Sequence, residues 1–228
     1  MKQLSKKAFV ASLPVMAGYV VLGTGFGILL SSKGYGIGWA LAMSIFIYAG
    51  SMQYLAVDLL AAGAGLITAA LTTLMVNARH LFYGISMIDK YKDCGPYKPY
   101  LIFGLTDETY SLNCAGAPEG IDDAPKYFIL VSLFNQCYWV LGSALGAALE
   151  SVLPFSTEGI DFSLTALFVT VFVEQWRSTK DHIPAILGVA ASVVCLALFG
   201  PGYFLILTMI LITVSLALYG KKGGAAHV

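Results

Sequence analysis

The sequence predicts an all-α polytopic membrane protein with about seven or eight membrane segments, some of them broken or re-entrant half-helices. Of its 228 residues, 58% are hydrophobic and 11% are charged, whereas about 25% of an average soluble domain is charged. The 13 Lys and Arg residues balance the 13 Asp and Glu residues. This composition excludes a soluble enzyme with a charged shell and a basic nucleic-acid-binding surface. We therefore expect a lipid bilayer around the chain and no nucleic-acid partner.

Eight apolar runs, separated by short polar or Gly- and Pro-containing segments, account for these membrane segments. No separating segment is long enough to be a linker, so we expect a single transmembrane domain over 1–228. The Ala/Gly stretch at 61–65 is typical of a tight turn between two runs. The runs are 8–30, 37–62, 64–88, 98–117, 126–149, 162–176, 183–199 and 202–220.

The first run is interpreted as a retained span and not as a signal peptide. It follows a lysine cluster but extends from residue 8 to residue 30, which is too long for a signal sequence, and no small-x-small site closes it. Gly23 and Gly27 stand in GxxxG spacing within it, and Gly142 and Gly146 repeat the spacing in a later run. Both pairs predict close helix packing.

The positions of Lys and Arg predict the orientation, because cytoplasmic loops hold the positive excess in membrane proteins. Ten of the thirteen cations fall in four clusters, and we expect these clusters and both termini to be cytoplasmic. The segments 150–161 and 200–202 contain no Lys or Arg and are expected outside. The clusters are Lys2, Lys6 and Lys7; Lys90, Lys92 and Lys98; Arg177 and Lys180; and Lys221 and Lys222.

A simple count of crossings conflicts with this orientation. If every run crossed the membrane once, the segment 89–98 would be outside despite its three lysines. The conflict disappears if 37–62 is a re-entrant hairpin broken at Ala49-Gly50-Ser51, and if 98–117, with the polar Thr106–Thr109 in its middle, is a second hairpin from the opposite side. A different assignment of crossings also satisfies the count, so the two hairpins are a hypothesis.

Polar residues within apolar runs are the candidates for function, because charges are costly in a bilayer. Asn77, Arg79 and His80 lie in the run 64–88. A guanidinium matches a carboxylate, so Arg79 is expected to hold a substrate or partner carboxylate; the alternative is an interfacial anchor that reaches the headgroups. His80 is interpreted either as a proton relay or as a packed neutral imidazole.

Asp107 and Glu108 are adjacent acids in the run 98–117. Adjacent residues point to different faces of a helix, so we expect different tasks: one acid pairs with Arg79, and the other binds an ammonium group or carries a proton. A structural ion pair is the alternative. The Thr106 and Thr109 hydroxyls are expected to cap the broken helix.

The remaining polar positions have simpler interpretations. Gln53 follows the expected break and binds either a substrate terminus or a neighbouring helix. Asn135 and Gln136 are expected to form hydrogen bonds between helices, and Glu174 an interfacial salt bridge with the cations that follow it. The four cysteines have no CxxC spacing and no nearby His, so no metal site or other cofactor is expected.

Three motifs together resemble one known family. YAGSMQYLAVDLL at 48–60, LMVNARHLFYGISM at 74–87 and FGLTDETYSLN at 103–113 are similar to the AzlC family, the large subunits of branched-chain amino-acid exporters, named for azaleucine resistance. The resemblance covers nearly the whole chain, including its length and the order of its runs. The family's motif positions fall on Gln53, Asn77, Arg79, His80, Thr106, Asp107 and Glu108.

The resemblance implies a permease of the bacterial cytoplasmic membrane that exports leucine, isoleucine and valine with a small AzlD-like membrane subunit. Alternating access driven by a proton gradient, through His80 or a carboxylate, is the mechanism that the polar residues favour. The alternatives are a permease for another small amphipathic metabolite, an intramembrane enzyme that uses Asp107, Glu108 and His80, and a membrane scaffold. No nucleophile–base spacing, metal constellation or ATP-binding motif is present, so we do not expect an enzyme.

Overall fold

The computed structural model describes residues 2–152 and 181–200, with isolated positions between 162 and 179 and between 207 and 219. All regular secondary structure in these described residues is helical, which confirms the predicted fold class. The chain forms two compact units, Met1–Thr165 and Ala166–Val228. Each unit is described by itself, and a single domain over 1–228 stays a prediction.

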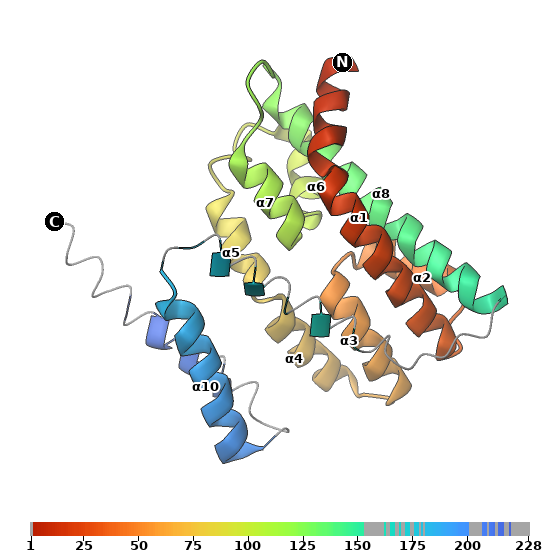
Figure 1. Ribbon diagram of the computed structural model, residues 1–228, viewed down its shortest axis with the longest axis vertical. Helices are drawn as coiled ribbons and strands as arrows, with labels where there is room; N and C mark the ends of the chain where they lie inside the picture. Colours follow the sequence, from red (N-terminus) through yellow and green to blue (C-terminus); the bar gives the residue numbers. More distant parts are fainter. Residues whose placement is uncertain are drawn as a thin grey trace. The chain divides into compact units, whose positions relative to one another are not determined.

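Two long helices form the frame of the first unit (Figure 1). Helix α1 (Lys2–Ser32) has 31 residues and α8 (Ala124–Val152) has 29, and both are long and apolar enough to cross a membrane. The two helices run parallel, because residues later in α1 contact residues later in α8. Phe9 packs edge-on against Phe134, whereas Gly27 faces Ser143.

The glycines of the two GxxxG pairs bring α1 and α8 together. A Cβ atom on Gly23 would lie 2.9 Å from the Trp139 carbonyl oxygen, and one on Gly142 would lie 2.8 Å from the Val20 carbonyl oxygen. Cβ atoms on the other two glycines, Gly27 and Gly146, would overlap the backbone of the opposite helix. The close packing predicted at each pair is confirmed, and the two pairs face each other.

The first predicted hairpin is present as two half-helices, α2 (Ile37–Phe46) and α3 (Gly50–Ala61). The break between them contains Tyr48 with φ 43°, a left-handed conformation that is rare for a residue other than glycine. Helix α2 ends beside α8, where the Gln136 amide donates to the Ile45 carbonyl oxygen, and α3 then runs back toward the end where α2 began (Figure 1). The predicted turn at 61–65 connects it to the next helix, with Gly63 at φ 60°.

The second hairpin enters from the opposite end of α1 and α8 (Figure 1). A short 3₁₀ turn η1 (Gly95–Tyr97) leads into α6 (Lys98–Phe103), and after a break at 104–106 the chain returns as α7 (Asp107–Ala115). Both predicted breaks are thus present. Each break lies in the middle of the first unit, where one half-helix ends and the next begins.

The run 64–88, which we predicted as one uninterrupted segment, also has a break. It consists of α4 (Leu66–Asn77) and α5 (Arg79–Ser86), which meet at Ala78. The hydrogen bonds there tighten to three-residue spacing: Ala78 donates to the Met75 carbonyl oxygen and accepts from the Leu81 amide. Neither Gly nor Pro stands at this position, so the sequence carries no local signal for the irregularity.

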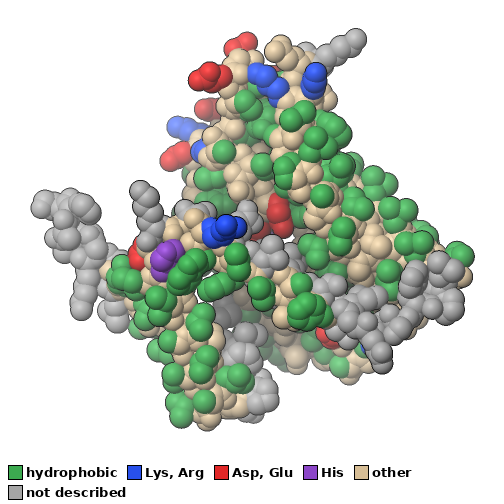
Figure 2. Space-filling view, in the orientation of Figure 1, with side chains coloured by type: hydrophobic (Ala, Val, Ile, Leu, Met, Phe, Trp, Pro, Cys, Tyr) green, Lys and Arg blue, Asp and Glu red, His purple; other side chains and the backbone are tan. Residues whose placement is uncertain are grey.

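Charged side chains gather at the end of the first unit where α1 begins (top of Figure 2). The Lys7 ammonium donates to the Glu119 carbonyl oxygen at 2.6 Å, and the Lys90 ammonium donates to the Cys114 carbonyl oxygen. The N-terminal lysines and the 90–98 cluster therefore lie at the same end, as the two hairpins require. Which side of the membrane this end faces stays a prediction.

In the second unit, α10 (Ile183–Phe199) is the long described helix. The Trp176 and His182 rings stack before it at 4.1 Å between centroids, and Gly200 ends it with φ 68°. The predicted salt bridge of Glu174 lies outside the described residues.

Candidate functional site

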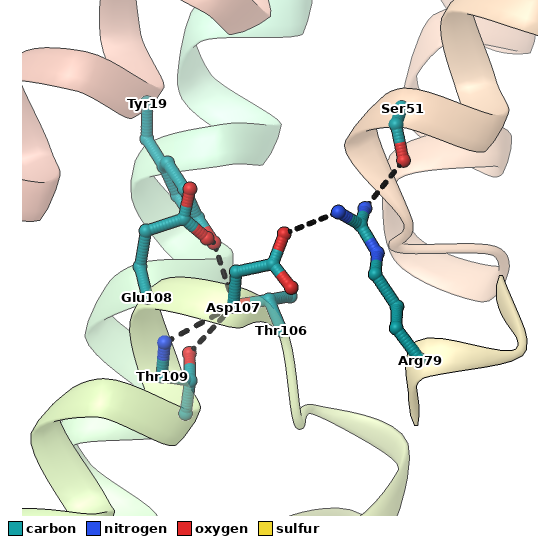
Figure 3. Close-up of polar contacts among 7 residues, drawn as sticks. All are labelled: Tyr19, Ser51, Arg79, Thr106, Asp107, Glu108 and Thr109. Carbon is teal, nitrogen blue, oxygen red and sulfur yellow. Dashed lines mark hydrogen bonds and ion pairs between the residues drawn. The ribbon is translucent and has the colours of Figure 1, made fainter. Parts of the chain in front are cut away.

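Three half-helices begin close together in the middle of the first unit, and each carries a polar side chain into the same place (Figure 3). Helix α3 carries Ser51, α5 begins with Arg79, and α7 begins with Asp107 behind its capping residue Thr106. The first turn of a helix leaves backbone N–H groups without intrahelical partners and carries a partial positive charge. The sequence therefore folds into a polar centre surrounded by apolar helices.

Arg79 pairs with one of the two adjacent acids, as expected from the sequence, and the structure shows that this acid is Asp107. Arg79 Nη1 lies 2.7 Å from Asp107 Oδ2, and Arg79 Nη2 donates to Ser51 Oγ at 2.7 Å (Figure 3). The two charged side chains are 28% and 16% exposed. This pair connects α5 with α7, and the Ser51 contact connects both with α3. The guanidinium is thus held by an acid on another element.

Glu108 has a different partner from its neighbour. Its Oε2 accepts a hydrogen bond from the Tyr19 hydroxyl at 2.6 Å, and that hydroxyl also lies 2.6 Å from Thr106 Oγ1. Within the described part of the chain, no Lys, Arg or His nitrogen lies at ion-pair distance from Glu108. The two acids thus differ as expected: Asp107 is paired with a cation, and Glu108 is held by a phenol.

Thr106 caps α7, as predicted from the sequence, whereas the Thr109 hydroxyl, also predicted to cap, accepts from side chains and from no backbone amide among the described residues. The backbone of Thr106 is extended, with φ −88° and ψ 174°, and its Oγ1 accepts from the Thr109 amide at 3.2 Å. The hydroxyls of Thr106 and Thr109 lie 3.0 Å apart, and the Asn135 amide of α8 donates to Thr109 Oγ1 at 3.0 Å. Asn135 is therefore an interhelical partner, as expected, and it joins α8 to the polar centre.

Two atoms of the ion pair are buried without a hydrogen-bond partner among the described residues. They are Arg79 Nε, a donor, and Asp107 Oδ1, an acceptor. Native proteins leave few buried polar atoms unpaired, and such atoms often mark a place that a ligand or water fills. A donor on a cation beside an acceptor on an anion is complementary to a molecule that itself carries both charges.

Gln53 does not belong to this centre. Its amide donates to Ser44 Oγ at 3.2 Å, and its carbonyl oxygen accepts from Trp139 Nε1 at 2.9 Å. Ser44 donates in turn to Ser143 Oγ at 2.9 Å. These contacts match the second of our two interpretations, in which Gln53 binds neighbouring helices.

His80 and Asn77 lie beside the ion pair without joining it. The His80 ring packs edge-on against Tyr83, with 5.8 Å between centroids, and Tyr83 stacks on Tyr110 at 4.5 Å. Asn77 is the last residue of α4, and its side-chain oxygen is buried without a hydrogen-bond partner in the described part of the chain.

Tyr19 and Tyr48 are the residues of the centre that the sequence did not reveal. Tyr19 is one aromatic residue within a long apolar run, and no neighbouring polar residue distinguishes it. Tyr48 lies in the break before α3 with its side chain 3% exposed, and its hydroxyl has no hydrogen-bond partner among the described residues. The one local signal for Tyr48 is its proximity to Ala49-Gly50-Ser51.

Helices long enough to cross a membrane, two hairpins of half-helices and a charged pair at their tips are typical of a polytopic membrane protein. A family model described as "AzlC protein" matches residues 14–153. The chain belongs to the AzlC family, which confirms the resemblance of its three motifs.

Individual relatives agree with this assignment. The chain is 44% identical over 208 residues, 91% of its length and 82% of the relative's, to the "Branched-chain amino acid transport protein AzlC" of Bacillus subtilis. It is 42% identical over 219 residues, 95% of both chains, to an "Uncharacterized membrane protein" of Helicobacter pylori. It is 28% identical over 177 residues, 75% of this chain and 72% of the relative, to the "Inner membrane protein YgaZ" of Escherichia coli. No solved structure matches the chain.

Proposed function

We propose that this protein is the large subunit of a secondary transporter that exports leucine, isoleucine and valine across the bacterial cytoplasmic membrane. The name of the Bacillus subtilis relative supports amino-acid transport and not catalysis. The observation that carries the proposal is the pair of unpartnered atoms, Arg79 Nε and Asp107 Oδ1, at the tips of the half-helices.

These two atoms fit the charged ends of a free amino acid. A substrate carboxylate accepts from Arg79 Nε and from the first turn of α3, whose N-cap residue Ala49 supplies no side-chain hydrogen bond. The substrate ammonium donates to Asp107 Oδ1. Both ends are bound while the Arg79–Asp107 pair stays intact, so neither buried charge loses its counterion.

A site of this kind selects a class of amino acids and not a single one. One methylene in an apolar pocket changes discrimination by about 1–3 kcal/mol. The charged ends are the same in leucine, isoleucine and valine, and their side chains differ by one methylene or by branching. We therefore expect overlapping affinities for the three and competition among them.

The two hairpins support alternating access. They enter from opposite ends of the first unit, and their tips meet at the ion pair (Figures 1 and 3). In transporters with broken helices, substrates bind near the bilayer midplane, and the elements around the site move against one another. We place the lysine-rich end with the N-terminus, and also the C-terminus, in the cytoplasm, in agreement with the positive-inside rule. A small AzlD-like membrane subunit completes the transporter, and the proton gradient drives export.

Counterflow of labelled leucine into leucine-loaded proteoliposomes tests the proposal, with the full chain alone and with a small AzlD-like subunit. Unlabelled isoleucine and valine are expected to compete. Isovalerate, which lacks the ammonium group, and isoamylamine, which lacks the carboxylate, are expected not to compete. Absence of leucine, isoleucine and valine flux in both preparations would contradict the proposal. Competition by isoamylamine as strong as by leucine would instead favour a permease for another small amphipathic metabolite.

A further inference from the structure

We propose that Glu108 is the group in this site that takes up and releases a proton, and that the hydrogen bond between the Tyr19 and Thr106 hydroxyls depends on its charge state. This inference rests on the proposed function and deepens it, because it selects one coupling residue among the site's titratable groups. Asp107 and His80 are the groups that it excludes.

The pairing of the two adjacent acids distinguishes them. A proton on Asp107 would break the 2.7 Å contact with Arg79 and leave a guanidinium without its counterion. A proton on Glu108 breaks no ion pair in the described part of the chain, since its partner is the neutral Tyr19 hydroxyl. It also removes a charge that is costly in a membrane interior. Proton exchange with water is therefore less disruptive at Glu108 than at Asp107.

The nearby cation Arg79 is already neutralised by Asp107, and no Lys, Arg or His in the described part of the chain forms an ion pair with Glu108. The His80 ring packs edge-on against Tyr83. The titratable and charged groups that face Glu108 are Tyr19 from α1, Tyr48 from the break before α3, Arg79 and Tyr83 from α5, and Asp107 from α7.

A continuous series of short contacts connects Glu108 with α8. The distances are 2.6 Å from Glu108 Oε2 to the Tyr19 hydroxyl, 2.6 Å from there to Thr106 Oγ1, 3.0 Å to Thr109 Oγ1 and 3.0 Å to Asn135 Nδ2. Each hydroxyl has one proton to donate. With Glu108 ionised, Tyr19 donates to it, and Thr106 donates to Thr109 Oγ1, which also accepts from the Asn135 amide. Neither hydroxyl then has a proton left for the 2.6 Å contact between Tyr19 and Thr106.

A proton on Glu108 Oε2 supplies the missing donor. Glu108 then donates to Tyr19, Tyr19 to Thr106, and Thr106 to Thr109, so each of these contacts has one donor and one acceptor. The hydrogen bond from Asn135 to Thr109 is unchanged, because a hydroxyl oxygen accepts two hydrogen bonds. Proton uptake by Glu108 thus decides whether the Tyr19 and Thr106 hydroxyls are hydrogen-bonded.

Two buried oxygens without partners lie beside the end of this series. Asn135 Oδ1 and the Tyr48 hydroxyl have no hydrogen-bond partner among the described residues, although both side chains are at most 3% exposed. Tyr48 faces Thr109, Tyr19 and Glu108, so its hydroxyl oxygen can accept the remaining proton of Thr109.

Infrared difference spectroscopy of the full chain in lipid vesicles tests the proton site without a transport measurement. Lowering the pH within the range in which exposed carboxylates stay ionised is expected to produce the carbonyl stretching band of a protonated carboxylic acid in the wild type and in Asp107→Asn, but not in Glu108→Gln. The matched control is Glu119→Gln, which changes an exposed loop acid and is expected to leave the band intact. An unchanged band in Glu108→Gln, or its loss in Asp107→Asn alone, would overturn the inference.

Transport measured in the same vesicles tests coupling. In Glu108→Gln, leucine counterflow is expected to lose its dependence on pH, and accumulation driven by a pH gradient is expected to fall at least tenfold. His80→Gln and Glu119→Gln are expected to keep the response to the gradient. Gradient-driven accumulation by Glu108→Gln at the wild-type level would overturn the inference. If the wild type transports no leucine, the proposed function fails, and the infrared band still decides whether Glu108 is the proton site.

Discussion

Replacing Gly27 by Ala tests the close contact between α1 and α8 on which the position of Tyr19 depends. The new Cβ atom would overlap the backbone of Ser143, and it would lie 2.7 Å from the Ala147 amide nitrogen, well inside the 3.4 Å at which ordinary contact begins. The opposing atoms belong to backbone and cannot rotate away. The two helices must therefore separate by at least about 0.7 Å, and a gap of about 0.5–1 Å forfeits a quarter to a half of each dispersion contact.

Gly18→Ala is the matched control, because Gly18 lies in the same helix and a Cβ atom there would meet nothing within 4 Å. Ala is a better helix former than Gly by about 1 kcal/mol, so Gly18→Ala is expected to be neutral or stabilising. Overpacking costs about 1–3 kcal/mol. Gly27→Ala gains the same helix propensity, so the two variants are expected to differ by the overpacking cost, about 1–3 kcal/mol in the free energy of unfolding.

Thermal unfolding of the purified protein in detergent measures this difference. A change of 1 kcal/mol corresponds to about 2–4 °C in Tm for a chain of this size, so the melting temperature of Gly27→Ala is expected about 2–12 °C below that of Gly18→Ala. Equal melting temperatures would refute the packing of α1 against α8. So would destabilisation of the same size in Gly18→Ala.

Three further changes have expected outcomes. Asp107→Asn leaves the Arg79 guanidinium, 28% exposed, without its counterion; we expect at least a hundredfold loss of leucine counterflow, with Asp107→Glu retaining more than Asp107→Asn. In an otherwise cysteine-free chain, a cysteine at Lys92 is expected to react with an impermeant maleimide from the cytoplasmic side, and one at Ala62 from the outside. Burial raises the pKa of the Cys94 thiol in the 87–97 segment, so its alkylation rate is expected to keep rising above the pH at which an ordinary thiol reaches its plateau.

Each of these outcomes has a clear contradiction. Full counterflow in Asp107→Asn would show that the ion pair does not bind substrate. Labelling of Lys92 and Ala62 cysteines from the same side would show that α4 and α5 do not carry the chain across the membrane. An alkylation profile for Cys94 that matches a free thiol in solution would contradict its burial.

Helix positions and most breaks were accessible from the sequence, because they depend on neighbouring residues. Ala49-Gly50-Ser51 and the polar stretch after Thr106 interrupt apolar runs, and the structure breaks both runs there. The break at Ala78 was not accessible, since the helix tightens there without Gly, Pro or a change in hydrophobicity. The GxxxG pairs predicted close packing, but the sequence did not show that they pack against each other.

The sequence by itself determined the fold class, the family and the identity of the charged residues. A charge within an apolar run can be recognised from the neighbouring residues, whatever the three-dimensional position of that run. Only the tertiary structure decided which acid Arg79 binds and which acid is held by Tyr19, a residue 89 positions from Glu108. The residues next to a carboxylate in the sequence do not show which side chain binds it. Its partner depends on which parts of the fold meet, and here the ends of three broken segments meet the middle of α1.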